Sequence, residues 1–370
     1  MKAGLLSKIT NLLTESKLVH NLARKKFIAL FVVALAKSRN VQFHAIAKHF
    51  NDNADPASSE VRIQDFLREV DIDYTLLTVF LLGFLAGNRK LRLCIDRTEW
   101  DFGSHQSNIL MVVAGYGDFM LPIYWAMLDN NSGNSSAQDR IDAVSHCIKL
   151  IGKERLGLVV ADREFVGNKW LKWLKDNNIN FVMRLPKGHY IYRADCSVQS
   201  VEGLGLSTEV PLVIQSVMVD GVWANVWVMK LKDGDFLFLF GTVTAKFMGQ
   251  LYRKRWGIEA CFQNLKQRGF DLEKSHLKND DKLRKLIALV SITYAVCTSL
   301  GIYQHKKVKP IRKKKHGYKE NSFARVGIDL IQKWFRPQNN IPEKTMTRIL
   351  AFFRLLAKRL RIYHEQKKDG

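Results

Sequence analysis

The sequence is poor in cysteine, and its cysteines form no recognisable chemical pattern. The five residues are odd in number, widely scattered over 370 positions, and include no CxxC pair or Cys/His cluster. This argues against both a disulfide framework and a structural zinc site. The opening segment, MKAGLLSKITNLL, is too polar for a secretory signal. We therefore predict a cytoplasmic protein in a reducing environment.

Acidic residues are scarce relative to basic ones. The chain has 58 Lys and Arg against 35 Asp and Glu, a formal net charge of +23. The like charges repel one another in a compact protein, so an excess of this size usually indicates that the protein binds a polyanionic partner. Nucleic acid is the leading candidate, because each neutralised phosphate releases a counterion. An acidic membrane surface and a merely soluble basic protein are the alternatives.

Only one long uncharged run is present, at residues 286–303. Its 18 residues, LIALVSITYAVCTSLGIY, just reach the length of a membrane-spanning helix. Hydroxyl side chains such as Ser291 and Thr298 interrupt it, and a core helix lying on a sheet is also apolar nearly all round. We expect a buried helix and no membrane partner.

Residues 1–88 are predicted to be entirely helical. Apolar residues recur at helical spacing over 19–37, a short helix follows at 41–51, and Ser58 or Ser59 is expected to cap a third helix. This order resembles a helix-turn-helix DNA reader. Three short helices also occur in any small bundle, so both readings stay open.

From residue 90 the pattern becomes that of an α/β protein. Strands are predicted at 90–95, 108–116, 119–128, 156–161 and 180–185, with helices at 137–151 and 169–175. Three strands in a meander, then helix, strand, helix and strand, is the order of the ribonuclease-H-like fold. Residues 187–244 read as an all-β insertion, and helical periodicity then runs from about 245 to 268.

Two aspartates follow strands of this predicted sheet. Asp96 ends the first strand in CIDRTEW, and Asp162 follows the buried strand 156–161 in LVVADREF. In a ribonuclease-H-like sheet these strands are neighbours, and strand ends face the crevice where ligands bind. Two carboxylates brought together repel, which suits a Mg²⁺ ion between them. Taken singly, each Asp is more often a turn former or a helix cap.

A third acid lies on a helical stripe. Tyr252, Arg255, Glu259 and Lys266 are spaced by three, four and seven residues, which places them within roughly 60° of one another around a helix. The plain alternative is a solvated face with an Arg–Glu pair. The side chains expected to pack on the other side are Trp256, Ile258 and Phe262. The nearby acids ranked below these candidates are Glu99, Asp101 and Glu164, the last as an ion-pair partner of Arg163 or Arg97.

The pattern Y-x2-R-x3-E-x6-K, formed without a gap by Tyr252, Arg255, Glu259 and Lys266, resembles the signature of the insertion sequence four family of bacterial DDE transposases. The resemblance covers residues 90–300. It implies a catalytic triad of Asp96, Asp162 and Glu259 that ligates two Mg²⁺ or Mn²⁺ ions. One ion activates the attacking water or 3′-hydroxyl, and the other stabilises the leaving oxygen.

The resemblance also implies DNA contacts. Tyr252, Arg255 and Lys266 would bind phosphates at the element's end, which positions DNA without reading its sequence. An aromatic residue of the β insertion, Trp223 or Trp227, would hold a flipped base, although packing is the commoner role. The acids Asp162 and Glu259 are 97 positions apart (259 minus 162), so the insertion is short and a hairpin intermediate stays an open question.

The predicted organisation follows. Residues 1–88 form a helical N-terminal DNA-binding domain, 89–304 a ribonuclease-H-like catalytic domain with its β insertion, and 305–370 a basic helical C-terminal region. The run 305–319 is either an arm that touches phosphate or a solvated loop. The expected function is metal-dependent cleavage and strand transfer at transposon ends, by a homodimer on double-stranded DNA. The alternative is a DNA-binding regulator or transposition inhibitor that does not cut.

Overall fold

One continuous sheet organises the chain. A computed structural model describes residues 2–50, 54–85, 87–101, 106–129, 133–204, 210–315, 317–336 and 341–367. Its ten strands lie in the order β3-β2-β1-β4-β5-β10-β9-β8-β6-β7. The strands are β1 (Leu91–Asp101), β2 (Gln106–Tyr116), β3 (Phe119–Met127), β4 (Leu156–Ala161), β5 (Phe181–Arg184), β6 (Tyr190–Tyr192), β7 (Val198–Ser200), β8 (Leu212–Val219), β9 (Val222–Lys230) and β10 (Phe236–Gly241).

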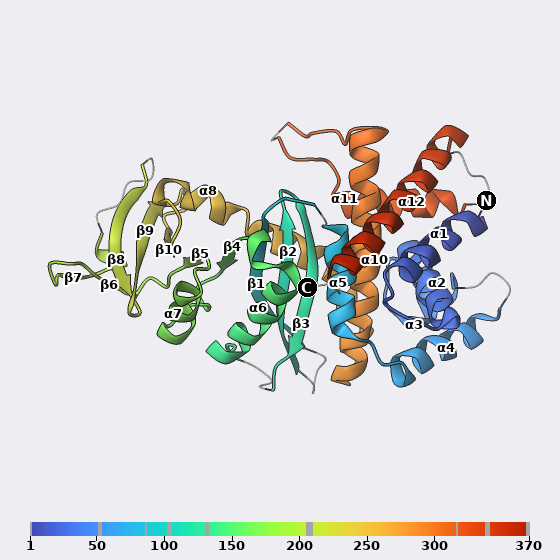
Figure 1. Cartoon of the computed structure of the whole chain (residues 1–370), viewed down its shortest axis with the longest axis horizontal. Coiled ribbons are helices and arrows are strands. Elements are labelled where there is room, and N and C mark those ends of the chain that lie inside the picture. Colours follow the sequence, from blue (N-terminus) through green and yellow to red (C-terminus); the bar gives the residue numbers. More distant parts are fainter. Residues whose placement is uncertain are drawn as a thin grey trace.

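Helices lie beside the sheet and gather at one end of the molecule (Figure 1). They are α1 (Lys2–Glu15), α2 (Leu22–Ser38), α3 (Phe43–Ala47), α4 (Pro56–Glu69), α5 (Tyr74–Phe84), α6 (Ala137–Ile151), α7 (Asn168–Asp176), α8 (Met248–Arg253), α9 (Trp256–Gln263), α10 (Asp280–Lys307), α11 (Phe323–Trp334) and α12 (Glu343–Gln366). The chain is therefore a mixed α/β protein with one large sheet.

The first and fourth strands are neighbours, as predicted. β1 pairs with β4 in parallel from Leu91 to Ile95, and with β2 antiparallel along nearly its whole length. The last four of the six residues of β4 are buried, as a central strand covered on both faces requires. The helices α6 and α7 supply the crossovers on either side of β4.

The β insertion predicted over residues 187–244 continues the main sheet. β10 pairs antiparallel with β5, from Leu239↔Arg184 to Gly241↔Val182, and β9 and β8 continue outward from it. The backbone groups at the edge of β5 are thus satisfied by the insertion itself, which extends the sheet away from the helical end (Figure 1).

The N- and C-terminal helices share one bundle. α12 packs against α1 and α5, and α11 packs against α10 and α2. The N-cap of α4 is Asp55, whose side chain accepts hydrogen bonds from the backbone N–H groups of Ala57 and Ser58, with Pro56 at the first helical position. The prediction of a serine cap at Ser58 or Ser59 is therefore wrong, since Pro56 already suits the first turn and starts the helix earlier.

The long apolar helix α10 has the length and composition of a membrane span, and 89% of its apolar window is buried inside the protein. It lies against α2, α5, α11 and β3. A core helix that is covered on all sides needs apolar residues all round. This placement agrees with the expectation of a buried helix.

Candidate active site

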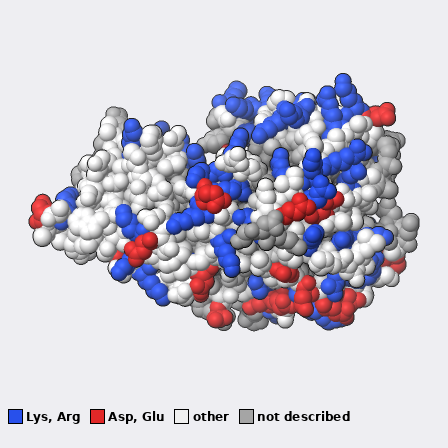
Figure 2. Space-filling model, in the orientation of Figure 1, with Lys and Arg blue, Asp and Glu red and all other residues white. Residues whose placement is uncertain are grey.

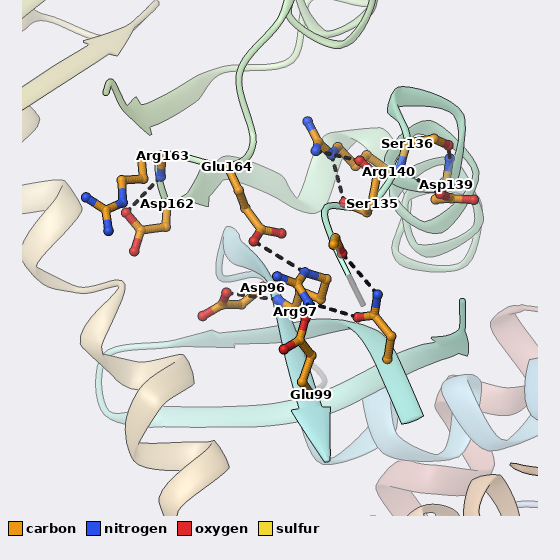
Figure 3. Close-up of polar contacts among 12 residues, drawn as sticks. Asp96, Arg97, Glu99, Ser135, Ser136, Asp139, Arg140, Asp162, Arg163 and Glu164 are labelled. Atoms are coloured by element: carbon orange, nitrogen blue, oxygen red, sulfur yellow. Dashed lines mark hydrogen bonds and ion pairs between the residues drawn. The ribbon is translucent and has the colours of Figure 1, made fainter. Parts of the chain in front are cut away.

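The two predicted aspartates lie side by side in the sheet. The pairing between β1 and β4 ends with Ile95 opposite Ala161. Asp96 and Asp162 are the next residues of the two segments. Each carboxylate accepts a hydrogen bond from the next backbone N–H, at 2.9 Å for Asp96 and 2.8 Å for Asp162. Figure 3 shows the two side chains leaning to the same side of the sheet. β1 does not end at Asp96 as predicted, because its pairing with β2 continues to Asp101.

One guanidinium joins all three predicted acids. Arg255 Nη1 lies 3.4 Å from Asp96 Oδ2, and Arg255 Nη2 lies 3.7 Å from Asp162 Oδ2. The same Nη2 also contacts Glu259 Oε1, one helical turn further along the chain. Folding thus gathers three acids that are far apart in sequence around a single cation whose side chain is only 11% exposed.

Burial shapes the charge of this cluster. Loss of water around the Asp96 carboxyl raises its pKa to about 6, although the neighbouring Arg255 guanidinium opposes that shift. The Asp162 charge adds to the rise. A carboxylate that has lost its hydration gains more from a nearby cation than an exposed one does. The site therefore favours a positive ligand beside Asp96.

Of the other two signature residues, Tyr252 contacts a triad acid and Lys266 pairs with an acid outside the triad. Tyr252 is buried, and its hydroxyl donates a hydrogen bond of 3.3 Å to Asp162 Oδ1. Lys266 Nζ lies 3.6 Å from Glu273 Oε1 and over the Trp100 ring, 5.9 Å from its centroid. Burial lowers the pKa of Lys266, with Glu273 opposing the shift. Tyr252 and Arg255 of the predicted stripe thus contact the acids, whereas Lys266 pairs with Glu273, outside the triad.

One member of the cluster escaped sequence analysis. Arg184 closes β5 and places Nη1 3.8 Å from Asp162 Oδ1, while its Nη2 lies 3.8 Å from Asp235. Because β5 is parallel to β4, a residue at its carboxyl end meets the residue after β4. The same rule that singled out Asp162 could have found Arg184 in NFVMRL.

A second polar network lies behind the two aspartates. Arg97 Nε lies 3.4 Å from Glu164 Oε2, and Arg97 also contacts Glu99. This confirms Arg97, rather than Arg163, as the partner of Glu164 (Figure 3). A cavity of about 340 Å³ opens between the network and the triad, lined by Asp96, Asn134, Asp162, Arg163 and Glu164. The side chain of Asp101 lies outside the described residues.

The three acids offer the type of ligand atom that a hard divalent cation prefers. Asp96, Asp162 and Glu259 offer carboxylate oxygens, which Mg²⁺ and Mn²⁺ prefer, and all three already share one positive partner in Arg255. In the part of the chain that the structure describes, no three His, Cys, Asp or Glu side chains are arranged to hold an ion as they stand. The three carboxylates instead contact the guanidinium of Arg255.

The helix that carries Glu259 is segmented, which the sequence did not reveal. α8 ends at Arg253, α9 begins at Trp256, and a π-helical turn covers Asn264–Arg268. Ile258 is buried as predicted. Trp256 is not, since 63% of it is exposed, so the expectation that it packs against the core is wrong. The backbone at the neighbouring Gly257 lies close to Met120 instead, since an added Cβ there would be 2.8 Å from the Met120 side chain.

The two tryptophans of the insertion differ in burial. Trp223 is 42% exposed, whereas Trp227 is 6% exposed. The Trp227 ring lies against Gly249, where an added Cβ would come within 2.6 Å of it. Trp227 is therefore a packing residue that joins the insertion to α8, and Trp223 is the one that a ligand can reach.

Known proteins that resemble this chain include a transposase family and a solved transposase structure. Residues 87–296 match the family model described as "Transposase DDE domain", a segment that contains all three acids and the arginine between them. No curated protein matches the sequence. Among solved structures, an electron cryo-microscopy structure of a piggyBac transposase synaptic complex with hairpin DNA is similar over 94% of this chain and 82% of that one, at 14% identity and a TM-score of 0.44.

Proposed function

The chain belongs to the transposase DDE domain family, and we propose that it cleaves DNA strands and joins them at the ends of an insertion sequence. The observation that carries this proposal is the convergence of Asp96, Asp162 and Glu259 on Arg255. Three carboxylates that contact one guanidinium offer the kind of ligands that a two-metal phosphoryl transfer uses. The Y-x2-R-x3-E-x6-K pattern supports placing the chain in the insertion sequence four group, with a ribonuclease-H-like core at 89–304.

In this proposal Asp96, Asp162 and Glu259 hold two Mg²⁺ or Mn²⁺ ions, which supply the activation of the nucleophile and the stabilisation of the leaving oxygen. The chain's own groups position the DNA. Arg255 and Lys266 carry positive charge to the edge of the acids, where a scissile phosphate would lie. The Tyr252 hydroxyl, now bonded to Asp162, fixes that carboxylate and can turn to a phosphate oxygen.

The partners follow from the same proposal. Double-stranded DNA, as transposon end and as target, fits the net charge of +23. The helices of residues 1–88 are the proposed DNA-reading domain, and a homodimer would hold two ends together. We also propose that the protein is located in the cytoplasm.

The test is substitution of the helix-borne acid. Glu259→Gln keeps the shape of the side chain and removes its charge, so strand cleavage of a duplex in Mg²⁺ should be lost while affinity for the same duplex in EDTA is retained. The matched control is Glu99→Gln, an acid that contacts Arg97 and none of the triad. Full cleavage by Glu259→Gln would remove the triad assignment.

A DNA-binding regulator that does not cut is the second candidate. It is favoured by the finding that the acids, among the residues described, are held by a guanidinium and not arranged around an ion. In this case wild-type protein would bind the duplex and leave it intact at all Mg²⁺ and Mn²⁺ concentrations.

A further inference from the structure

The loop between α10 and α11 is strongly basic and exposed. Residues 308–315 and 317–320, named here the basic loop, contain six Lys and Arg residues and one acid, Glu320. The four consecutive cations from Arg312 to Lys315 are all exposed. Figure 1 shows the loop leaving the end of α10 and reaching over the sheet, and Figure 2 shows Lys and Arg side chains gathered along the same edge.

The basic loop is folded rather than loose. Lys313 and Lys319 form an antiparallel bridge, and the backbone N–H of Lys314 donates to the Tyr318 carbonyl at 2.8 Å. The backbone N–H of Glu320 donates to the Arg312 carbonyl, also at 2.8 Å. These bonds fix the backbone that carries the four cations, so less backbone entropy remains to be lost on binding.

Both ends of the basic loop are attached to the body of the protein. At one end, the N–H of Ile311 donates to His305 Nδ1 on α10 at 2.8 Å. At the other, Lys319 Nζ lies 2.5 Å from Asp118 in the turn between β2 and β3, and over the Phe323 ring. Lys319 thus anchors the loop to the body of the protein.

The remaining cations lack acidic partners. Over the ranges that the structure describes, Arg312, Lys313, Lys314 and Lys315 form no ion pair with a carboxylate. They line a hollow of about 400 Å³ together with Glu320. Four neighbouring cations beside a single acid raise the energy of the free protein by mutual repulsion. A row of anions that fills the hollow would relieve that repulsion.

We propose that the basic loop is a docking surface for the phosphate backbone of duplex DNA, outside the active site. A duplex supplies one negative charge per about 1.7 Å of axis, which matches a row of consecutive cations. A membrane surface fits less well, because the apolar window of the neighbouring helix α10 is 89% buried, and Tyr318 is the one exposed large apolar side chain among the described residues of the loop. Phosphate contacts carry no base preference, so the surface acts on any sequence.

The position of the basic loop suits the same duplex that enters the active site. Its anchor, Asp118, follows Gly117, whose carbonyl accepts a hydrogen bond from Arg92 at 3.3 Å. Arg92 and Asp96 are four residues apart on β1, on the order of 14 Å along a strand. The anchor of the loop is thus connected, through the turn between β2 and β3, to the strand that carries Asp96.

This inference rests on the proposed function, since it takes DNA as the substrate, and its test separates the two. The variant is Lys313→Ala, Lys314→Ala and Lys315→Ala combined. The control combines Lys172→Ala, Lys175→Ala and Lys232→Ala, three exposed lysines elsewhere. Binding of a labelled random-sequence duplex is measured in EDTA, so that no strand is cut, at several salt concentrations.

The loop variant should bind roughly 10- to 100-fold more weakly, with a slope of log affinity against log salt reduced by about two to three. The control and a charge-preserving Lys→Arg version of the loop variant should keep the wild-type slope. Equal losses in the loop variant and the lysine control would overturn the inference while leaving the nuclease proposal intact. Absence of DNA binding by wild type would overturn both.

Discussion

Arg255 and Asp96 lie 159 residues apart in sequence, and Arg255 Nη1 is 3.4 Å from Asp96 Oδ2. The pair joins a helix that follows the β insertion to the central strand of the sheet. Through the same guanidinium, Asp96 is connected to Asp162 and Glu259. Arg255 is therefore the cation that all three acids share, and several measurements can test its role.

Loss of that arginine should destabilise the metal-free protein. Arg255→Ala leaves three partly buried carboxylates without their shared cation, and removing one partner of a buried ion pair costs about 3 kcal/mol. Urea unfolding in EDTA at pH 7 measures the difference. The control, Arg163→Ala, removes an exposed cation from the same cavity, and its effect should stay within about 0.5 kcal/mol. Equal stability of Arg255→Ala and wild type would contradict the central role of Arg255.

The same substitution should strengthen metal binding. In wild type the Arg255 guanidinium must move away from the carboxylates before they can hold an ion. The apparent affinity for the ion is therefore lowered in proportion to the small fraction of protein in which the guanidinium has moved away. Arg255→Ala should therefore bind Mn²⁺ more tightly, by roughly tenfold. Electron paramagnetic resonance of free Mn²⁺ measures this without DNA or cleavage. Weaker Mn²⁺ binding by the variant would show that the arginine supports the ions instead of competing with them.

Asp96 should make stability depend on pH. Burial raises its pKa from 3.8 to about 6, so folding favours the protonated form. The stability that this form provides is fully present below pH 3.8 and is lost as the pH rises through 6. Asp96→Asn cannot ionise, so its stability relative to wild type should improve by about 2 kcal/mol between pH 4 and pH 7. Urea midpoints in EDTA across this range measure it, and a difference that does not vary with pH would argue against a raised pKa.

The two insertion tryptophans should respond differently to truncation. Trp227→Ala empties a packed position beside Gly249, and we expect a loss of about 3–5 kcal/mol in unfolding free energy. Trp223→Ala removes a side chain that is 42% exposed, so its cost should stay below about 1 kcal/mol. Thermal or urea unfolding of both variants checks this. Similar losses at the two positions would mean that Trp223 also packs in the core.

The helix α10 should not anchor the protein in a membrane. Its apolar window is 89% buried by other parts of the chain, so little apolar surface remains for lipid. After cell lysis without detergent, the protein should stay in the supernatant of a high-speed spin. Recovery only from detergent-extracted membranes would show that α10 leaves the core.

Periodicity located most of the elements that build the site. The alternation before Asp96 and the apolar run before Asp162 identified two central strands, and the register of Ile95 with Ala161 places them together. The break between α8 and α9 was invisible, because the apolar spacing continues through it. The exposure of Trp256 was missed for a related reason: whether a large apolar side chain finds a partner depends on what the facing strand presents.

By itself, the sequence determined the net charge, the order of strands and helices, and the carboxylates that could hold a metal, because each depends on residue type and local spacing. Only the tertiary structure decided that β10 joins β5 in one sheet, that Arg184 reaches Asp162, and that a single guanidinium sits among three acids. Those relationships arise from side chains that approach through space, where distance and lost hydration, and not position in the chain, set the energy of each contact.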